Sequence, residues 1–258
     1  MLKTFGAAAV LMLAPAAHAD NEVLVVGGQT SVLLNTAALS DLASLDLSGV
    51  TSNVIVPGEI EGSVAFPINE RGTKGELLPT SFGFDLGNFL GSFFGAIEHE
   101  GSVLFNNDTV EVGNFTIGFD ATRITKDASG FFVESTVGIP AILFDVANPS
   151  ELAAKGDGVV IGADLLVSPE FAGFLVDNGL AKLDLTGADV GDALFEGDVG
   201  CTAADTNDDG RVSGRDFFRY LFQFVTGRDA ADFDGDGFLT GPDVRAFFQA
   251  FGPCTRGR

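Results

Sequence analysis

The chain has 258 residues, 46% of them apolar, and its formal net charge is −22 at pH 7. This apolar content supports a packed core and excludes a disordered chain, and the length fits one or two domains. The chain has 36 acidic and 14 basic residues, which excludes binding to nucleic acid or to an anionic membrane surface by electrostatic attraction.

The first 19 residues predict a secretory signal peptide. Lys3 gives a basic start, residues 6–14 form an apolar run, and Ala17-His18-Ala19 is a small-x-small cleavage site. The apolar run is shorter than the about 20 residues that a membrane span needs; an uncleaved N-terminal anchor is the alternative. We therefore expect a secreted protein, extracellular or at the cell surface, with no transmembrane segment.

Residues 20–196 predict a mainly β domain, built as a sandwich or a barrel. Apolar or alternating runs recur between breaks rich in Gly, Pro and Asn. The predicted strands are 22–26, 31–34, 52–56, 62–68, 101–105, 109–119, 130–137, 142–145, 158–167 and 181–185. Short helices are predicted at 37–45 and 169–176, the second capped by Ser168.

This β segment contains no catalytic constellation. It has no Gly-x-Ser-x-Gly elbow and no phosphate-binding loop, and a glycosidase carboxylate pair is not singled out by any motif. His99 is its only histidine, which excludes a zinc site with two His ligands, and we expect it exposed on a strand edge. Trp is absent and the single Tyr, Tyr220, lies outside the segment, so a stacking platform for sugars is poorly supplied.

One string in the segment carries a resemblance. Residues 97–105, Ile-Glu-His-Glu-Gly-Ser-Val-Leu-Phe, with apolar positions in 62–66 and 110–119, resemble haem-transport-associated β domains of exported bacterial proteins. No ligand residue is carried over from this resemblance, so the ligand and function of residues 20–196 stay open.

Composition changes near residue 200. Residues 20–200 hold 27 acids and 6 bases, whereas residues 201–258 hold 9 acids and 7 bases, all Arg. We therefore predict a second module, residues 197–258, joined through a short linker at 196–200. Cys201 and Cys254 frame it, and in an exported protein such a pair predicts a disulfide, which would stabilise the module by about 4 kcal/mol.

The second module contains an internal repeat, residues 205–216 and 232–243, aligned without gaps 27 residues apart. Each copy has acid or amide groups at positions 1, 3 and 5, Gly at 6, an aliphatic residue at 8, a hydroxyl at 9 and Asp at 12. This is the EF-hand calcium-loop pattern, which supplies the six to eight oxygens that Ca²⁺ prefers. The predicted ligands are Asp205, Asn207, Asp209, Arg211 (carbonyl), Ser213 and Asp216 for one ion, and Asp232, Asp234, Asp236, Phe238 (carbonyl), Thr240 and Asp243 for a second.

Each loop is followed, but not preceded, by a helix-forming run. Apolar residues at helical spacing predict two helices that pack against each other: Phe217, Phe218, Leu221, Phe222 and Val225, then Val244, Phe247, Phe248 and Phe251. Arg215, Arg219 and Arg245 are expected on the solvated faces.

Two such loop-helix units in tandem resemble a dockerin type I domain. The leading Gly200-Cys201 and the closing Cys254 resemble the cysteine-framed anchoring tails of exported bacterial proteins. The resemblance implies calcium in both loops, a cohesin-like or surface-anchored protein partner, and association with polysaccharide-degrading assemblies. Family recognition uses loop positions 10 and 11, often a Ser-Thr type pair; here they are Gly214, Arg215, Gly241 and Pro242.

Three functions fit these observations. The first is a secreted, non-catalytic β domain that a calcium-binding, dockerin-like module tethers to a partner or surface. The second is a secreted polysaccharide-degrading enzyme on the same tether. The third is a calcium-stabilised structural or adhesive protein without a cohesin partner. The lack of a catalytic constellation favours the first.

Overall fold

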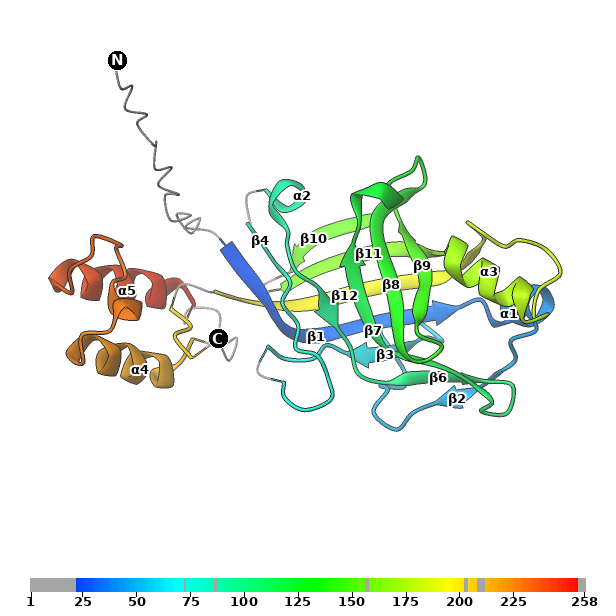
Figure 1. Ribbon diagram of the computed structural model, residues 1–258, viewed down its shortest axis with the longest axis horizontal. Helices are drawn as coiled ribbons and strands as arrows, with labels where there is room; N and C mark the ends of the chain where they lie inside the picture. The colour runs from blue at the N-terminus through cyan, green and yellow to red at the C-terminus, as the bar shows by residue number, and fades with distance from the viewer. Residues whose placement is uncertain are drawn as a thin grey trace, which may run out of the picture.

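The computed structural model of the chain describes residues 22–71, 73–85, 88–155, 158–201, 204–207 and 212–254 (Figure 1). The predicted signal peptide lies outside these residues. The strands are β1 (Glu22–Leu34), β2 (Leu47–Val50), β3 (Val64–Pro67), β4 (Gly83–Asp85), β5 (Ile97–Glu98), β6 (Ser102–Phe105), β7 (Val110–Phe119), β8 (Ala128–Gly138), β9 (Ala141–Ala147), β10 (Glu151–Lys155), β11 (Gly158–Val167) and β12 (Asp189–Cys201). The helices are α1 (Thr36–Ala43), α2 (Phe89–Ser92), η1 (Ala121–Arg123), α3 (Pro169–Asp177), α4 (Gly214–Val225), η2 (Asp229–Ala231) and α5 (Gly241–Cys254).

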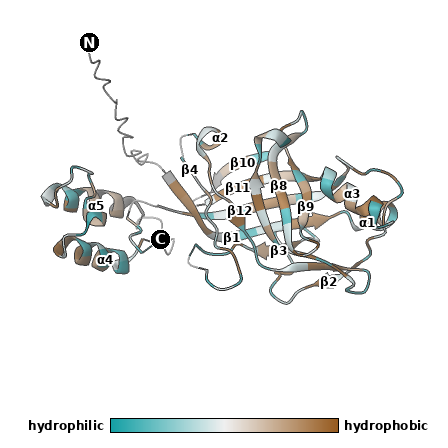
Figure 2. Cartoon of the chain, viewed as in Figure 1, coloured by the Kyte–Doolittle hydropathy of each residue, from teal (hydrophilic) through white to brown (hydrophobic). Residues whose placement is uncertain are grey.

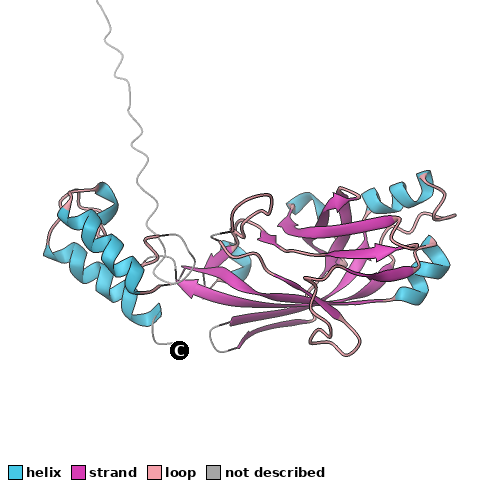
Figure 3. Cartoon of the chain, turned by 90° about the horizontal axis from the view of Figure 1, so that it is seen from below, coloured by secondary structure: helices cyan, strands magenta, loops and turns pink. Residues whose placement is uncertain are grey.

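The prediction of a mainly β region is confirmed. The strands form one sheet in the order β2-β6-β7-β8-β9-β11-β12-β1-β3, and every strand pair described is antiparallel. The sheet curls on itself (Figure 3). Two isolated bridges, Ile55 with Ala65 and Ile68 with His99, then join the β3 side to the β2 and β5 side. The curled sheet therefore encloses an interior lined by apolar residues, and Figure 2 shows that hydrophobic positions recur along its strands.

The longest pair, β1 with β12, departs from the sequence prediction. We expected two strands, 22–26 and 31–34, separated by a glycine turn; the structure has one strand with a register shift between Val25 and Gly27. Gly28 makes this continuity possible, because it has φ +113 and a Cβ there would lie 2.1 Å from the carbonyl oxygen of Glu196. The expected linker 196–200 is also wrong, since these residues pair with β1 and the strand runs on to Cys201.

Strands at 101–105, 109–119, 130–137, 142–145 and 158–167 are confirmed within two residues as β6, β7, β8, β9 and β11, and 62–68 contains the shorter β3. Residues 52–56 and 181–185 form no strand. The predicted helices are confirmed as α1 and α3. Ser168 caps α3 by accepting a hydrogen bond from the Phe171 backbone N–H at 3.0 Å.

Two apolar clusters form the interior of the β region. One lies under α1 and α3 and includes Phe105, Leu143 and Leu175. The other lies toward β4 and α2 and includes Val25, Phe82 and Phe195. The first cluster places α1 and α3 as a cover over one end of the curled sheet, which Figure 1 shows on the right.

The expectation of an exposed His99 is wrong, because its exposed fraction is 2%. Its Nδ1 lies 3.1 Å from the carbonyl oxygen of Phe115, which can only accept, so Nδ1 carries the proton. Nε2 then accepts a hydrogen bond from the Thr30 hydroxyl at 2.8 Å. The neutral imidazole thus connects β1 to β7 across the seam of the sheet, and burial lowers the pKa of His99 to about 4.

This pKa predicts a pH-dependent stability. In the unfolded chain His99 takes up a proton below about pH 6.5, whereas the folded protein resists protonation until about pH 4. The contribution of neutral His99 is therefore complete above pH 6.5 and is lost as the pH falls from 6.5 to 4, by about 3 kcal/mol at most. Chemical denaturation at pH 7 and at pH 4.5 measures it.

The control is His99→Gln, which removes the titrating group and leaves every carboxylate in place. We expect the loss of stability on acidification to be smaller in this variant, whatever its stability at pH 7. An equal loss in both proteins would show that His99 does not titrate as described.

Candidate metal centre in the C-terminal loops

After β12 the chain enters two loops, each followed by a helix, α4 and α5. The two helices lie side by side beyond the end of the β1–β12 pair in both views (Figures 1 and 3). Their apolar cluster is separate from the clusters of the β region, and Tyr220 stacks on Phe247 at its centre, with ring centroids 4.1 Å apart. Val212 and Leu239, position 8 of each loop, both pack in this cluster.

Of the five α4 residues predicted to pack between the helices, only Phe217 does so. Phe217, Tyr220 and Phe224 belong to the cluster. In contrast, Phe218, Leu221, Phe222 and Val225 are exposed, with exposed fractions from 42% to 71%. We call these four residues the α4 patch. Arg215, Arg219 and Arg245 are exposed, as predicted.

The two loops that repeat in the sequence, 27 residues apart, also repeat the same hydrogen bonds. The position-12 residues Asp216 and Asp243 are both fully buried. Asp216 accepts from the backbone N–H of Asn207 at 3.3 Å and of Ser213 at 2.8 Å. Asp243 accepts from the equivalent donors, Asp234 at 3.3 Å and Thr240 at 2.7 Å. Each aspartate therefore joins the start of its loop to the end of the same loop.

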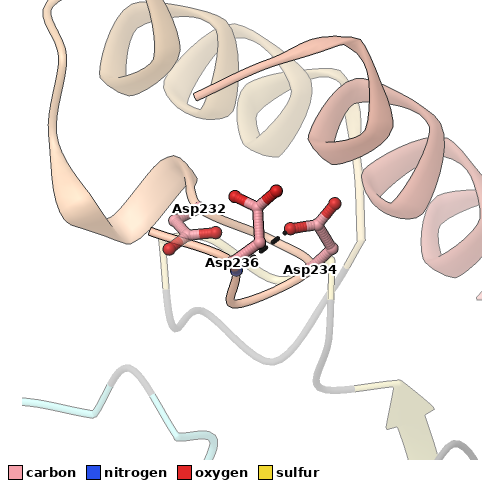
Figure 4. Close-up of side chains that lie close together, drawn as sticks. All are labelled: Asp232, Asp234 and Asp236. Carbon is pink, nitrogen blue, oxygen red and sulfur yellow. Dashed lines mark hydrogen bonds between the residues drawn. The ribbon is translucent and has the colours of Figure 1, made fainter. Parts of the chain in front are cut away.

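The second loop brings three carboxylates together (Figure 4). Oxygens of Asp232, Asp234 and Asp236 lie within 4.8 Å of one another. The loop folds around these side chains, because Asp232 accepts from the N–H groups of Gly235 at 2.9 Å and of Gly237 at 2.8 Å. Both glycines have positive φ, 75° and 84°, which residues with a Cβ rarely adopt.

This spacing fits a divalent cation. Oxygens that bind one Ca²⁺ at about 2.3–2.6 Å can lie at most about 5 Å apart, and the three carboxylates meet that limit. The donors are all hard oxygens, the type that Ca²⁺ prefers over nitrogen or sulfur. Among the described residues, no Lys or Arg forms an ion pair with these carboxylates, so a cation would relieve their mutual repulsion.

The pKa values of two carboxylates in this loop are shifted in opposite directions. Burial, and then the charges of Asp236, Asp243 and Asp232, raise the pKa of Asp234. For Asp243 burial acts in the same upward direction. Backbone N–H groups of Thr240, Asp234 and Phe233 outweigh it, and the pKa of Asp243 is lowered. Asp243 is therefore held as a carboxylate by the loop itself.

Of the first loop, the structure describes residues 205–207 and 212–216. Asp205 is buried, Asn207 is half-buried, and Ser213 caps α4 in a capping box with Asp216. Asp209 and Arg211 lie outside the described residues. The sequence analysis missed Thr206, whose hydroxyl donates to the backbone carbonyl of Asp216 at 2.9 Å. No motif position marks that residue.

The other predicted site residues are placed as follows. Phe238 and Thr240 are exposed in the second loop, and so are Gly214, Arg215, Gly241 and Pro242 at the starts of α4 and α5. Gly214 and Arg215 begin α4, the helix that carries the α4 patch, whereas Gly241 and Pro242 begin α5. The side chains of Cys201 and Cys254 are outside the described part of the structure, so their disulfide stays a prediction.

Comparisons with known proteins add little. No family model matches the chain, and no curated protein matches it. One solved structure, the C-terminal domain of HtaA from Corynebacterium glutamicum, is similar at 15% identity and a TM-score of 0.43, over 69% of this chain and 99% of that one. Within the described residues, no helix has both the length and the apolar character to cross a membrane.

The buried aspartates give a test that needs no metal. Asp243→Ala removes the acceptor for three backbone N–H groups, Phe233, Asp234 and Thr240. We expect the C-terminal helices to lose about 2–4 kcal/mol of stability in chelator, measured by denaturation followed through Tyr220 absorbance. Asp229→Ala, an exposed acid of η2 outside the loop, is the control and should lose less than about 0.5 kcal/mol. Equal effects would contradict the role of Asp243.

Proposed function

We propose that the two loops each bind one Ca²⁺ and that the module they form tethers the β region of a secreted protein to a protein partner. The observation that carries the calcium proposal is the repeated hydrogen bonding of Asp216 and Asp243. It supports two equivalent loops rather than one chance acidic turn. The EF-hand-like, dockerin-like character of residues 197–258 is part of this proposal.

The carboxylates support an ion-coupled fold. Backbone N–H donors stabilise the charged carboxylate at position 12, while positions 1, 3 and 5 of the second loop crowd three carboxylates together. Among the described residues, the apolar cluster between α4 and α5 has five buried members, Ala204, Val212, Tyr220, Ala231 and Phe247. A core of that size supplies little stability by itself, so bound Ca²⁺ and the predicted disulfide would supply much of the rest.

The α4 patch supports the tether. Phe218, Leu221, Phe222 and Val225 stand at i, i+3, i+4 and i+7, which is one face of a helix, and that face is exposed. Exposed apolar stripes of this kind mark protein interaction surfaces. Gly214 and Arg215 lie at the start of the same helix, so recognition through positions 10 and 11 would extend this surface. In this proposal the β region is the part of the protein that the C-terminal module attaches to the partner.

Calcium binding predicts a stoichiometry. Isothermal titration of the full chain should give two Ca²⁺ per chain, with dissociation constants between about micromolar and millimolar. Asp232→Ala and Asp205→Ala should each remove one ion, because each removes a position-1 ligand. Asp229→Ala should keep both. Absence of bound Ca²⁺ in the wild-type chain after loading and desalting, by elemental analysis, would end the proposal.

The tether predicts a calcium-dependent partner. The full chain, immobilised and exposed to surface proteins of the source cells, should retain one protein in calcium and release it in chelator. Phe218→Ser with Phe222→Ser should abolish retention while both Ca²⁺ ions still bind. Leu183→Ser, an equally exposed apolar residue of the β region, should retain the partner. Retention that survives chelator would favour a structural protein whose calcium loops take no part in binding.

A further inference from the structure

The curled sheet contains a cavity that the proposed tether does not use. Its volume is about 420 Å³, and side chains from most of the strands line it. Protein interiors rarely keep a void much larger than a water molecule, whereas small-molecule sites occupy about 300–1,000 Å³. The cavity therefore has the size of a ligand site rather than of a packing defect.

The cavity lining is almost wholly apolar. Among the described residues that line it, eleven are phenylalanines and none is Asp, Glu, Lys or Arg. The polar lining residues are Thr30, His99, Ser129 and Asn148. Thr30 and His99 bond each other, and Ser129 and Asn148 donate to the carbonyls of Val146 and Lys126. Little hydrogen-bonding capacity is left over for a ligand.

The cavity has a closed end and an open end. Leu39 of α1 and Phe171 of α3 close one end, and both are buried. At the other end the lining residues Leu90 of α2, Ile124 and Pro149 are exposed. Phe93 and Phe119, whose rings lie 4.8 Å apart, connect α2 to the end of β7 there. A ligand would enter beside Leu90 of α2 and Ile124.

Charge excludes one class of ligand. A charged group inside the cavity would lose its hydration with no counter-charge to replace it. Next to Ile124 in the chain, Arg123 is already paired with Asp145 at 2.6 Å and Glu170 at 2.7 Å, and Lys126 is paired with Asp127 at 2.5 Å. The chain as a whole is strongly acidic, so an anionic head group gains nothing at the entrance.

We propose that the cavity of the β region binds an uncharged, predominantly apolar small molecule with aromatic rings. Ring-bearing ligands fit because the phenylalanine side chains offer both faces and edges for offset-stacked and edge-to-face contacts. Two small side chains line the cavity side by side on β11 and β12, because Ala163 and Ala193 are cross-strand partners. These alanines leave the space that larger side chains would fill.

A pair of fluorescent probes tests the ligand class. N-phenyl-1-naphthylamine is uncharged, and 8-anilino-1-naphthalenesulfonate has the same rings with a sulfonate added. With the full chain in calcium we expect one N-phenyl-1-naphthylamine bound per chain at micromolar concentration, and at least tenfold weaker binding of the sulfonate. No saturable binding of the neutral probe, or equal binding of both, would overturn the proposal.

Variants locate the binding. Ala193→Leu and Ala163→Leu each fill part of the cavity and should weaken the neutral probe at least tenfold without lowering the melting temperature. Ala153→Leu, the same change at an exposed position of β10, should bind as wild type. Phe222→Ser in the α4 patch should also bind as wild type, which separates this site from the proposed tether. Wild-type binding in both folded cavity variants would overturn the proposal; if one variant does not fold, the other decides.

Discussion

The antiparallel pairing of β1 with β12 is the contact on which the rest of the structure depends. It joins the first strand to the last strand of the sheet over eleven residue pairs, from Val23 with Cys201 to Leu34 with Gly191. This pairing holds Thr30 at the seam, where it bonds His99, and Ala193 in the cavity wall. It also ends at Cys201, so the same strand delivers the chain to the first loop.

The two ends of the chain use polar groups in opposite ways. In the β region the buried polar groups are neutral and satisfied by one another, as Thr30, His99 and the Phe115 carbonyl show. In the C-terminal loops the buried groups are carboxylates held by backbone N–H donors. The first arrangement suits an uncharged ligand, because the polar groups already bond one another and apolar contacts remain. The second suits a cation, because the clustered carboxylates of the loop carry negative charge.

Local patterns were readable from the sequence. The alternation in 109–119 and 158–167, the Ser168 cap and the repeat of 205–216 in 232–243 all depend on residues a few positions apart. The position-12 aspartates could be identified as the residues that close each loop for the same reason. The expected linker at 196–200 failed because its Gly and Asp residues have low strand propensity, and pairing with β1 overrides that propensity. The exposed α4 patch was misassigned because helical spacing shows that a stripe exists, not which of two stripes faces the partner helix.

The sequence by itself determined the contiguous chemistry: a mainly β region, two acidic loops with glycines where the backbone must turn, and a helix after each loop. Only the tertiary structure decided that His99 is buried, that one strand runs from Asp189 to Cys201, and that eleven phenylalanines far apart in the chain line one cavity. The reason is the range of the interactions. A loop that folds around its own side chains is encoded within twelve residues, whereas a cavity wall exists only after the strands have paired and the sheet has curled.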